Sequence, residues 1–102
     1  MKLEWTDPAV EDLTSIRDFI ARDSPQYARQ FIGRIIAAAE RLAAFPEMGR
    51  KVPESLEEGI REILFHSYRI IYRREPERIR ILTVLHASRD LARREPKPWE
   101  VE

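Results

Sequence analysis

Apolar residues in the first half of the chain recur every three or four positions, which is the spacing of one face of a helix. The first stripe consists of Val10, Leu13, Ile16 and Ile20. It follows a start signal, with Thr6 or Asp7 as the cap and Pro8 in the first turn. The pattern predicts a helix from this signal to Arg22-Asp23, where the stripe ends.

A second helix is predicted to begin in the same way, with Ser24 as its cap and Pro25 behind it. Its stripe consists of Ala28, Phe31, Ile32, Ile35, Ala39 and Leu42. Phe45-Pro46 breaks the pattern and starts a loop that runs to Gly59. Because only about three residues separate the two helices, they are expected to form an antiparallel hairpin.

The second half of the chain is predicted to form strands. Ile60–Phe65, Tyr68–Arg73 and Ile79–Leu85 are rich in β-branched and aromatic residues. His66-Ser67 and Arg74–Glu77 provide the turns between them. The last of these strands is almost entirely apolar, which is typical of a central strand that is covered on both faces.

The two ends of the chain complete the prediction. Lys2–Trp5 is expected to be a short first strand, and a helical turn is expected after Asp90. Arg93–Glu102 reads as an extended C-terminal tail anchored by Trp99. The order β-α-α-β-β-β predicts a two-layer α+β fold, with the helical hairpin packed on an antiparallel sheet of three strands plus the N-terminal one. A chain of 102 residues forms one domain of this kind.

Alternation along the strands assigns side chains to the two faces of the sheet. The residues expected to face the helices are Leu64, Ile70, Tyr72, Leu82 and Val84. The opposite face is expected to be open and to hold Arg61, Ile63, Arg69, Ile71, Arg73, Ile81, Thr83 and Leu85. An exposed face that mixes arginine with apolar side chains usually marks a surface for a partner.

Charge is balanced over the whole chain but not along it. The 18 basic and 18 acidic residues cancel, yet residues 60–102 carry 10 basic and 7 acidic groups, and most of the basic ones are arginine. Arginine suits bidentate contacts to carboxylate or phosphate, although a solvated mixed-charge surface explains the composition more simply. A protein that acts alone on nucleic acid needs a large basic excess, so this chain is not expected to bind DNA sequence-specifically by itself.

Several classes of function are excluded by what the sequence lacks. Without cysteine there is no disulfide, thiolate metal site or thiol nucleophile. His66 and His86 lie far apart and have no nearby pattern of acidic ligands, so neither a metal nor a cofactor is expected. The first residues do not form a signal peptide, and no apolar run approaches the roughly 20 residues that cross a bilayer, so the expected location is the cytoplasm.

Four stretches resemble the ParE/RelE superfamily of toxins from type II toxin–antitoxin modules, some of which stabilise plasmids. They are WTDPA…DL from residue 5, FPEMGR from residue 45, YRIIY from residue 68 and VLHASRDL from residue 84. The resemblance runs from about residue 3 to residue 91 and implies that residues 1–102 are a single toxin domain. It also implies the family fold, a helical hairpin on a small antiparallel sheet.

The superfamily has two main activities, since RelE-type members cut mRNA on the ribosome and ParE-type members poison DNA gyrase. The RelE pattern has two basic residues on the second strand, an arginine after the tyrosine that opens the third, a basic residue past the fourth, and a tyrosine near the C-terminus. Arg61 and Arg69 match this pattern. Ile63 stands at the second basic position, and Arg93 stands about where the tyrosine is expected.

The position past the last strand falls on Ala87, or on His86 if the register shifts by one. These departures favour the ParE branch, so the resemblance implies a toxin that inhibits DNA gyrase. A ribosome-dependent mRNA endonuclease of the RelE type and a non-toxic binding module are the alternatives. The candidate catalytic or poisoning residues are Arg61, Arg69, Arg73, His86 and Arg89. For His86 a packing role, and for Arg89-Asp90 a local ion pair, are simpler explanations.

The resemblance further implies a cognate, ParD-like antitoxin as partner. A partly disordered antitoxin segment is expected to fold along the open face of the sheet. Its predicted contacts are Ile63, Arg69, Ile71, Arg73, Ile81 and Leu85. The alternative is that Ile71 and Leu85 belong to the core of the chain itself.

Overall fold

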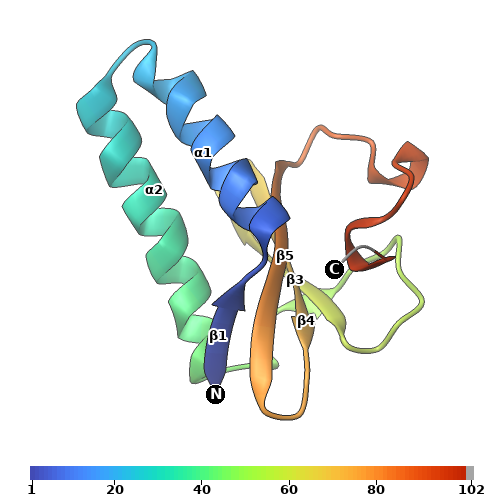
Figure 1. Cartoon of the computed structure of the whole chain (residues 1–102). Helices are drawn as coiled ribbons and strands as arrows, with labels where there is room; N and C mark the ends of the chain where they lie inside the picture. The colour runs from blue at the N-terminus through green and yellow to red at the C-terminus, as the bar shows by residue number, and fades with distance from the viewer. Residues whose placement is uncertain (101–102) are drawn as a thin grey trace.

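The computed structural model describes residues 1–100 and shows an α+β fold in the predicted order (Figure 1). The strands are β1 (Lys2–Trp5), β2 (Arg50–Lys51), β3 (Ile60–Phe65), β4 (Tyr68–Arg74) and β5 (Arg78–His86). The helices are α1 (Asp7–Ala21) and α2 (Pro25–Glu40), with 3₁₀ turns η1 (Arg41–Ala43), η2 (Leu91–Arg93) and η3 (Pro98–Glu100). No helix among these is long and apolar enough to cross a membrane.

All five strands belong to one sheet with the order β1-β5-β4-β3-β2. The last three strands form the expected antiparallel meander, while β1 runs parallel to β5, with Lys2 opposite Arg78. The sheet is therefore mixed, and β2 is a strand that the sequence did not predict. β5 lies between β1 and β4, so its nearly continuous apolar run matches its place inside the sheet.

The predicted caps start both helices. The Thr6 hydroxyl accepts a hydrogen bond from the amide of Ala9 at 3.3 Å, and the Ser24 hydroxyl accepts one from the amide of Tyr27 at 3.1 Å. Each bond satisfies an amide that the helix itself leaves without a partner. The two helices lie side by side across one face of the sheet (Figure 1).

We call the apolar layer between the helices and the sheet the helix-side core. Its buried members are Ala9, Ile16, Phe31, Ile35, Ala39, Leu42, Ile70, Tyr72, Ile79, Ile81 and Val84. Both helices bury most of their predicted stripes in this layer, so the periodicity of the sequence accounts for much of it. Val10 is the exception, because it is 48% exposed and the neighbouring Ala9 is buried in its place.

The opposite face of the sheet is not open, and this prediction is wrong. A second buried cluster, which we call the tail-side core, consists of Val52, Ile60, Ile71, Leu82, Leu85, Leu91 and Trp99. The loop after β2 and the C-terminal segment supply the cover (Figure 1). The helical turn expected after Asp90 is present as η2. Trp99 is only 7% exposed and anchors the tail as predicted, but the tail forms the turn η3 rather than being extended throughout. Residues 101–102 of the predicted tail lie outside the described residues.

The face assignment of β3 is also wrong. Ile63 pairs with Ile70 and packs against the helix-side core, whereas Leu64 pairs with Arg69 on the other face and is 56% exposed. Both alternating sets of this strand contain apolar residues, so alternation alone does not decide which set is buried.

On β5 the error has a local cause. The register shifts between Ile71 and Tyr72, so that Ile71 lies opposite Thr83 but Tyr72 lies opposite Ile81. This β-bulge places Ile81 in the helix-side core and Leu82 in the tail-side core, the reverse of the prediction. Val84 and Leu85 lie on the faces that alternation assigned to them.

Candidate functional site

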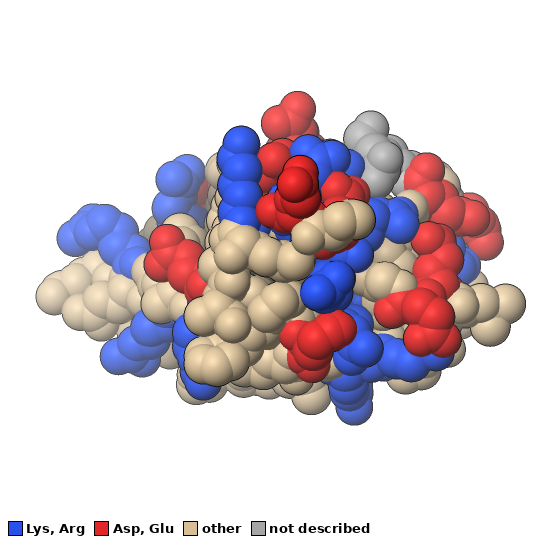
Figure 2. Space-filling model, turned by 90° about the horizontal axis from the view of Figure 1, so that it is seen from below, with Lys and Arg blue, Asp and Glu red and all other residues tan. Residues whose placement is uncertain are grey.

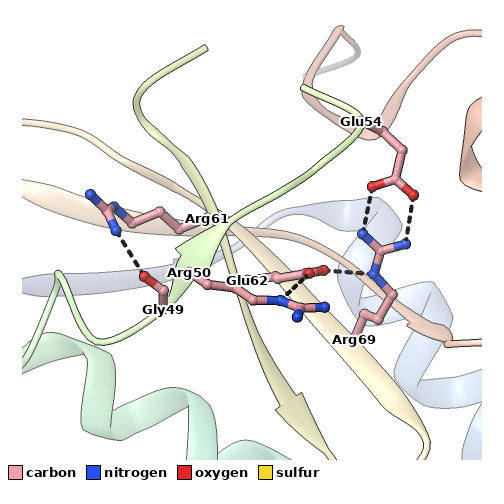
Figure 3. A network of polar contacts seen from close by, with 6 residues as sticks. All are labelled: Gly49, Arg50, Glu54, Arg61, Glu62 and Arg69. Atoms are coloured by element: carbon pink, nitrogen blue, oxygen red, sulfur yellow. Dashed lines mark hydrogen bonds and ion pairs between the residues drawn. The ribbon is translucent and has the colours of Figure 1, made fainter. Parts of the chain in front are cut away.

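A network of charged side chains lies on the tail-side face of the sheet, centred on Glu62 of β3 (Figure 3). The Glu62 side chain is fully buried, and its two oxygens accept from Nε of Arg50 at 2.8 Å and from Nε of Arg69 at 2.6 Å. The remaining nitrogens of Arg69 donate to both oxygens of Glu54, at 3.1 and 2.8 Å. Arg69 is thus held by two carboxylates, one of them in a bidentate pair.

The charges in this network stabilise one another. The hydrogen bonds that Arg69 donates to Glu54, and after them those that it donates to Glu62, raise the pKa of Arg69. Burial of the guanidinium opposes this rise. The same guanidinium lowers the pKa of Glu54. Three of the five N–H donors of Arg69, one on each nitrogen, already bind carboxylate oxygens, which leaves one N–H on each Nη for any further acceptor.

Arg61 lies in a different environment. It is opposite Tyr72, whose side chain belongs to the helix-side core, and its Nη1 donates to the carbonyl of Gly49 at 2.8 Å (Figure 3). The Tyr72 hydroxyl accepts from the amide of Gly49 at 3.0 Å and donates to the carbonyl of Pro46 at 2.9 Å. Burial raises the pKa of this tyrosine, although the bond from Gly49 opposes the rise. Arg61 and Tyr72 therefore hold the loop before β2 against the sheet.

Close contact explains the glycine in that loop. A Cβ atom at Gly49 would lie 2.5 Å from the Tyr72 hydroxyl and 2.7 Å from the backbone oxygen of Glu62. No side chain fits at that separation, so the FPEMGR stretch has a structural role in fixing this loop.

Arg73 connects the tail to the rest of the chain. Its Nη1 donates to Glu57 in the loop after β2 at 2.9 Å, and its Nη2 donates to the carbonyl of Trp99 at 2.6 Å. This side chain therefore fastens both segments that cover the tail-side core.

His86 and Arg89 line a cavity of about 930 Å³ between α1 and the end of β5. The amide of Ser88 donates to Nδ1 of His86 at 3.1 Å, so a neutral ring carries its proton on Nε2. The rings of Tyr68 and His86 meet edge to face at 5.4 Å between centroids. Arg89 is exposed at the side of this cavity.

The five candidate catalytic residues do not form one site. Arg69 and Arg73 lie on the tail-side face, Arg61 holds a loop beside the helix-side core, and His86 and Arg89 line the cavity. Among residues 1–100 no group of three or more acidic or histidine ligands could hold a metal ion. Sequence reasoning missed Glu54 and Glu62 because single acids in a loop and a strand carry no spacing signal.

The predicted antitoxin contacts are not on an accessible surface either. Ile71 and Leu85 are buried in the tail-side core, as the alternative prediction held, and Ile81 is buried in the helix-side core. Ile63 is partly buried against the helices. The arginines of that set are paired with acids of their own chain.

The order of elements and the single mixed sheet define the class of the protein, which is the fold of the ParE/RelE toxin superfamily. More narrowly, the chain belongs to the family described as the ParE toxin of the type II toxin–antitoxin system parDE, whose sequence model matches residues 3–91. The last turn of the tail, with Trp99, lies beyond the matched residues.

Curated relatives include toxins named for RelE. The chain is 36% identical to toxin RelE2 of Caulobacter vibrioides over 85 residues, which cover 83% of this chain and 93% of the relative. It is 33% identical to the putative toxin Y4kP of Sinorhizobium fredii over 86 residues, covering 84% of this chain and 88% of the relative.

Solved structures agree on the fold. A chain from the chromosomal ParDE toxin–antitoxin system of P. aeruginosa superposes with a TM-score of 0.72 at 25% identity, covering 84% of this chain and 95% of that one. A chain of the toxin–antitoxin complex RelBE2 of Mycobacterium tuberculosis superposes with a TM-score of 0.61 at 22% identity, covering 83% and 95%. The names of these relatives belong to both branches of the superfamily.

Proposed function

We propose that this chain is a toxin that inhibits DNA gyrase and that a cognate antitoxin neutralises it. Membership in the ParE toxin family supports the role as a toxin. One observation supports gyrase rather than RNA as the target. Arg69, which matches a basic position of the RelE pattern, is held by Glu54 and Glu62.

The chemistry of RNA cleavage explains why this observation matters. Cleavage through the 2′-OH needs a base, an acid and a cation that converge on one phosphate. To pair fully with a substrate phosphate, Arg69 would have to release Glu54 or the buried Glu62, and releasing Glu62 would leave that buried carboxylate with Arg50 as its remaining partner, which is costly. Inhibition of gyrase is an interaction between proteins and requires no such convergence of Arg61, Arg69 and His86.

The alternative is a ribosome-dependent mRNA endonuclease of the RelE type. It is favoured by the relatives named RelE2 and RelE3, the first of them 36% identical to this chain. Both targets, gyrase and the ribosome, are found in the cytoplasm, so either function places this chain there.

An antitoxin partner is proposed because both solved neighbours come from toxin–antitoxin systems. The charge of the chain does not favour direct action on nucleic acid. On the face seen in Figure 2, basic and acidic side chains are interspersed, and the net charge of the chain is zero.

Two assays on the purified protein test this proposal. The first measures supercoiling of relaxed plasmid by DNA gyrase, and the second measures mRNA cleavage in the ribosomal A site. We expect supercoiling to be inhibited and the mRNA to stay intact. Expression in cells without the antitoxin should stop growth, and co-expression of the antitoxin should restore it.

Three other results have distinct meanings. Cleavage of mRNA with gyrase unaffected identifies the RelE-type alternative. Normal growth without the antitoxin, together with two negative assays, identifies a non-toxic binding module. Growth arrest with both assays negative points to a target other than the two proposed here.

A further inference from the structure

The cavity of about 930 Å³ combines an apolar floor with a charged rim. Its buried apolar lining, which we call the floor, comes from Ile16 and Val84 of the helix-side core and from Leu85 and Leu91 of the tail-side core. On its α1 side stands Phe19, a large apolar side chain that is 65% exposed. An exposed aromatic beside an apolar hollow is typical of a surface that a partner covers.

The acids that line this cavity are already engaged within the chain. Asp12 accepts hydrogen bonds from the Thr83 hydroxyl and from the amide of Val84, the latter at 3.0 Å. Asp18 pairs with Arg17 at 3.2 Å, and Asp90 pairs with Arg93 at 3.3 Å. Neither Arg17 nor Arg93 lines the cavity.

The arginines that line it are not engaged in this way. Arg22, Arg89 and Arg94 form no ion pair with a carboxylate within residues 1–100, and Arg22 lies over the ring of Phe19 at 5.7 Å. They differ in this respect from Arg69 and Arg73, which hold acids of their own chain. The rim of the cavity thus carries positive charge that an external anion can reach without first breaking an internal ion pair.

We propose that this cavity binds an acidic segment of the cognate antitoxin. One large apolar side chain of the segment would lie on the floor beside Phe19, and its carboxylates would pair with Arg22, Arg89 and Arg94. This inference rests on the proposed function and moves the antitoxin contact from the buried face of the sheet to the groove between α1 and β5.

A peptide fits this site better than a nucleic acid. Asp12, Asp18 and Asp90 stand among the arginines, and they repel a backbone that carries a phosphate at every nucleotide. A peptide can instead place single carboxylates opposite single arginines. The apolar floor also accepts a side chain that is buried as an anchor.

The test compares two double charge reversals by calorimetric titration with the antitoxin encoded by the adjacent gene. The variant Arg89→Glu/Arg94→Glu reverses the charge at two positions on the rim of the cavity. In the matched control, Arg29→Glu/Arg34→Glu, the same change is made at exposed positions of α2 that do not line the cavity. We expect the rim variant to lose at least about tenfold in affinity and the control to stay within about twofold, because only the rim faces the acids.

Two further measurements separate electrostatics from damage to the fold. The affinity of the wild type should fall as sodium chloride is raised, and the rim variant should lose most of this dependence. Thermal melting followed by circular dichroism should show that both variants melt within a few degrees of the wild type. If the rim variant does not fold, Phe19→Ser replaces it, since this residue is exposed and its loss should still weaken binding about tenfold.

The possible failures are distinguishable. If the wild type does not bind the antitoxin, the proposed function fails and this inference fails with it. If the wild type binds and a folded rim variant binds equally well, the inference alone is overturned. If the rim variant binds the antitoxin normally but loses binding of a 20-nucleotide single-stranded DNA, the cavity is a nucleic-acid site instead.

Discussion

On one face of the sheet, two capped helices of 15 and 16 residues cover a large apolar layer, whereas on the other a loop and two 3₁₀ turns cover a smaller one. The helices satisfy most of their backbone hydrogen bonds internally. The loop and the tail have no comparable series of backbone hydrogen bonds, and arginine side chains of the sheet hold them in place. Arg69 binds Glu54 of the loop, and Arg73 binds Glu57 of the loop and the carbonyl of Trp99 in the tail.

The two covers of the sheet are also expected to differ in how easily they detach from it. A cover held by a few side-chain contacts can come away locally, while a helical hairpin packed along its whole length leaves only when the domain unfolds. The helix-side core therefore determines the global stability of the protein, and the tail-side core determines how firmly its second layer is attached.

The sharpest comparison uses two neighbours on β4 that are both fully buried, Ile70 on the helix side and Ile71 on the tail side. We expect Ile70→Ala to lower the free energy of unfolding by about 2–5 kcal/mol, the usual cost of such a cavity. Ile71→Ala should cost less, because the tail can move to fill the space. Urea denaturation measures both values. An equal or larger loss for Ile71→Ala would show that the two covers are equally rigid.

A somewhat smaller effect is expected at the centre of the ion network. Glu62→Gln leaves the buried Nε of Arg69 without a carboxylate and should cost about 1–3 kcal/mol. Glu58→Gln is the matched control, since the Glu58 side chain is 83% exposed and pairs with Lys51 at the surface, and it should leave the free energy of unfolding nearly unchanged. Similar losses for the two variants, again from urea denaturation, would contradict a structural role of the buried carboxylate.

The anchor of the tail should show a local effect. Trp99→Ala removes the aromatic ring that packs on the tail-side core, and we expect the amides of residues 91–100 to exchange hydrogen much faster. The loss of global stability should stay below the roughly 3 kcal/mol at which such truncations begin in a rigid core. Hydrogen-exchange mass spectrometry measures the exchange of the tail and of the helices in one experiment. If exchange in α2 also became faster, the tail would not be a unit that opens separately.

The smallest effect concerns pH. Because Arg69 holds the pKa of Glu54 below the ordinary value of a glutamate, about 4.3, this pair stabilises the folded chain above that pH and the contribution is lost as pH falls through the lowered pKa. Glu54→Gln should therefore reduce the difference in melting temperature between pH 7 and pH 3, by at most about 4–8 °C. Glu11→Gln, at an exposed position of α1, is the control and should leave the difference unchanged.

The sequence predicted the helix-side core well and the tail-side core poorly, for a physical reason. Periodic stripes and the caps Thr6 and Ser24 mark a helix that buries one face. Leu91 and Trp99 lie in irregular turns, where burial follows no period, so the sequence indicated that Trp99 anchors the tail but not that the tail covers the second face of the sheet. A bulge likewise leaves no signal in alternation, and this is why Ile81 and Leu82 were assigned to the wrong faces.

The candidate site was predicted less well than the fold. The family pattern pointed to Arg61 and Arg69, but sequence alone does not reveal that each is used inside the chain, one by the carbonyl of Gly49 and the other by Glu54 and Glu62. Side-chain partners of this kind are set by tertiary contact. The cavity beside α1 could not be foreseen either, because its lining comes from three separate parts of the chain, residues 12–22, Tyr68 and residues 84–94.

The parallel pairing of β1 with β5 has a consequence for the order of folding. β1 is synthesised long before β5, the strand that it pairs with and that begins at Arg78. Thr6, which follows β1, also donates a hydrogen bond to the carbonyl of Ile81 in β5. The helical hairpin and the β3–β4 turn are local and can form early, whereas closing a loop of this length is slow. The first strand must therefore wait for nearly the last one, and a chain that stops before β5 lacks both the partner of β1 and the strand against which α1 packs.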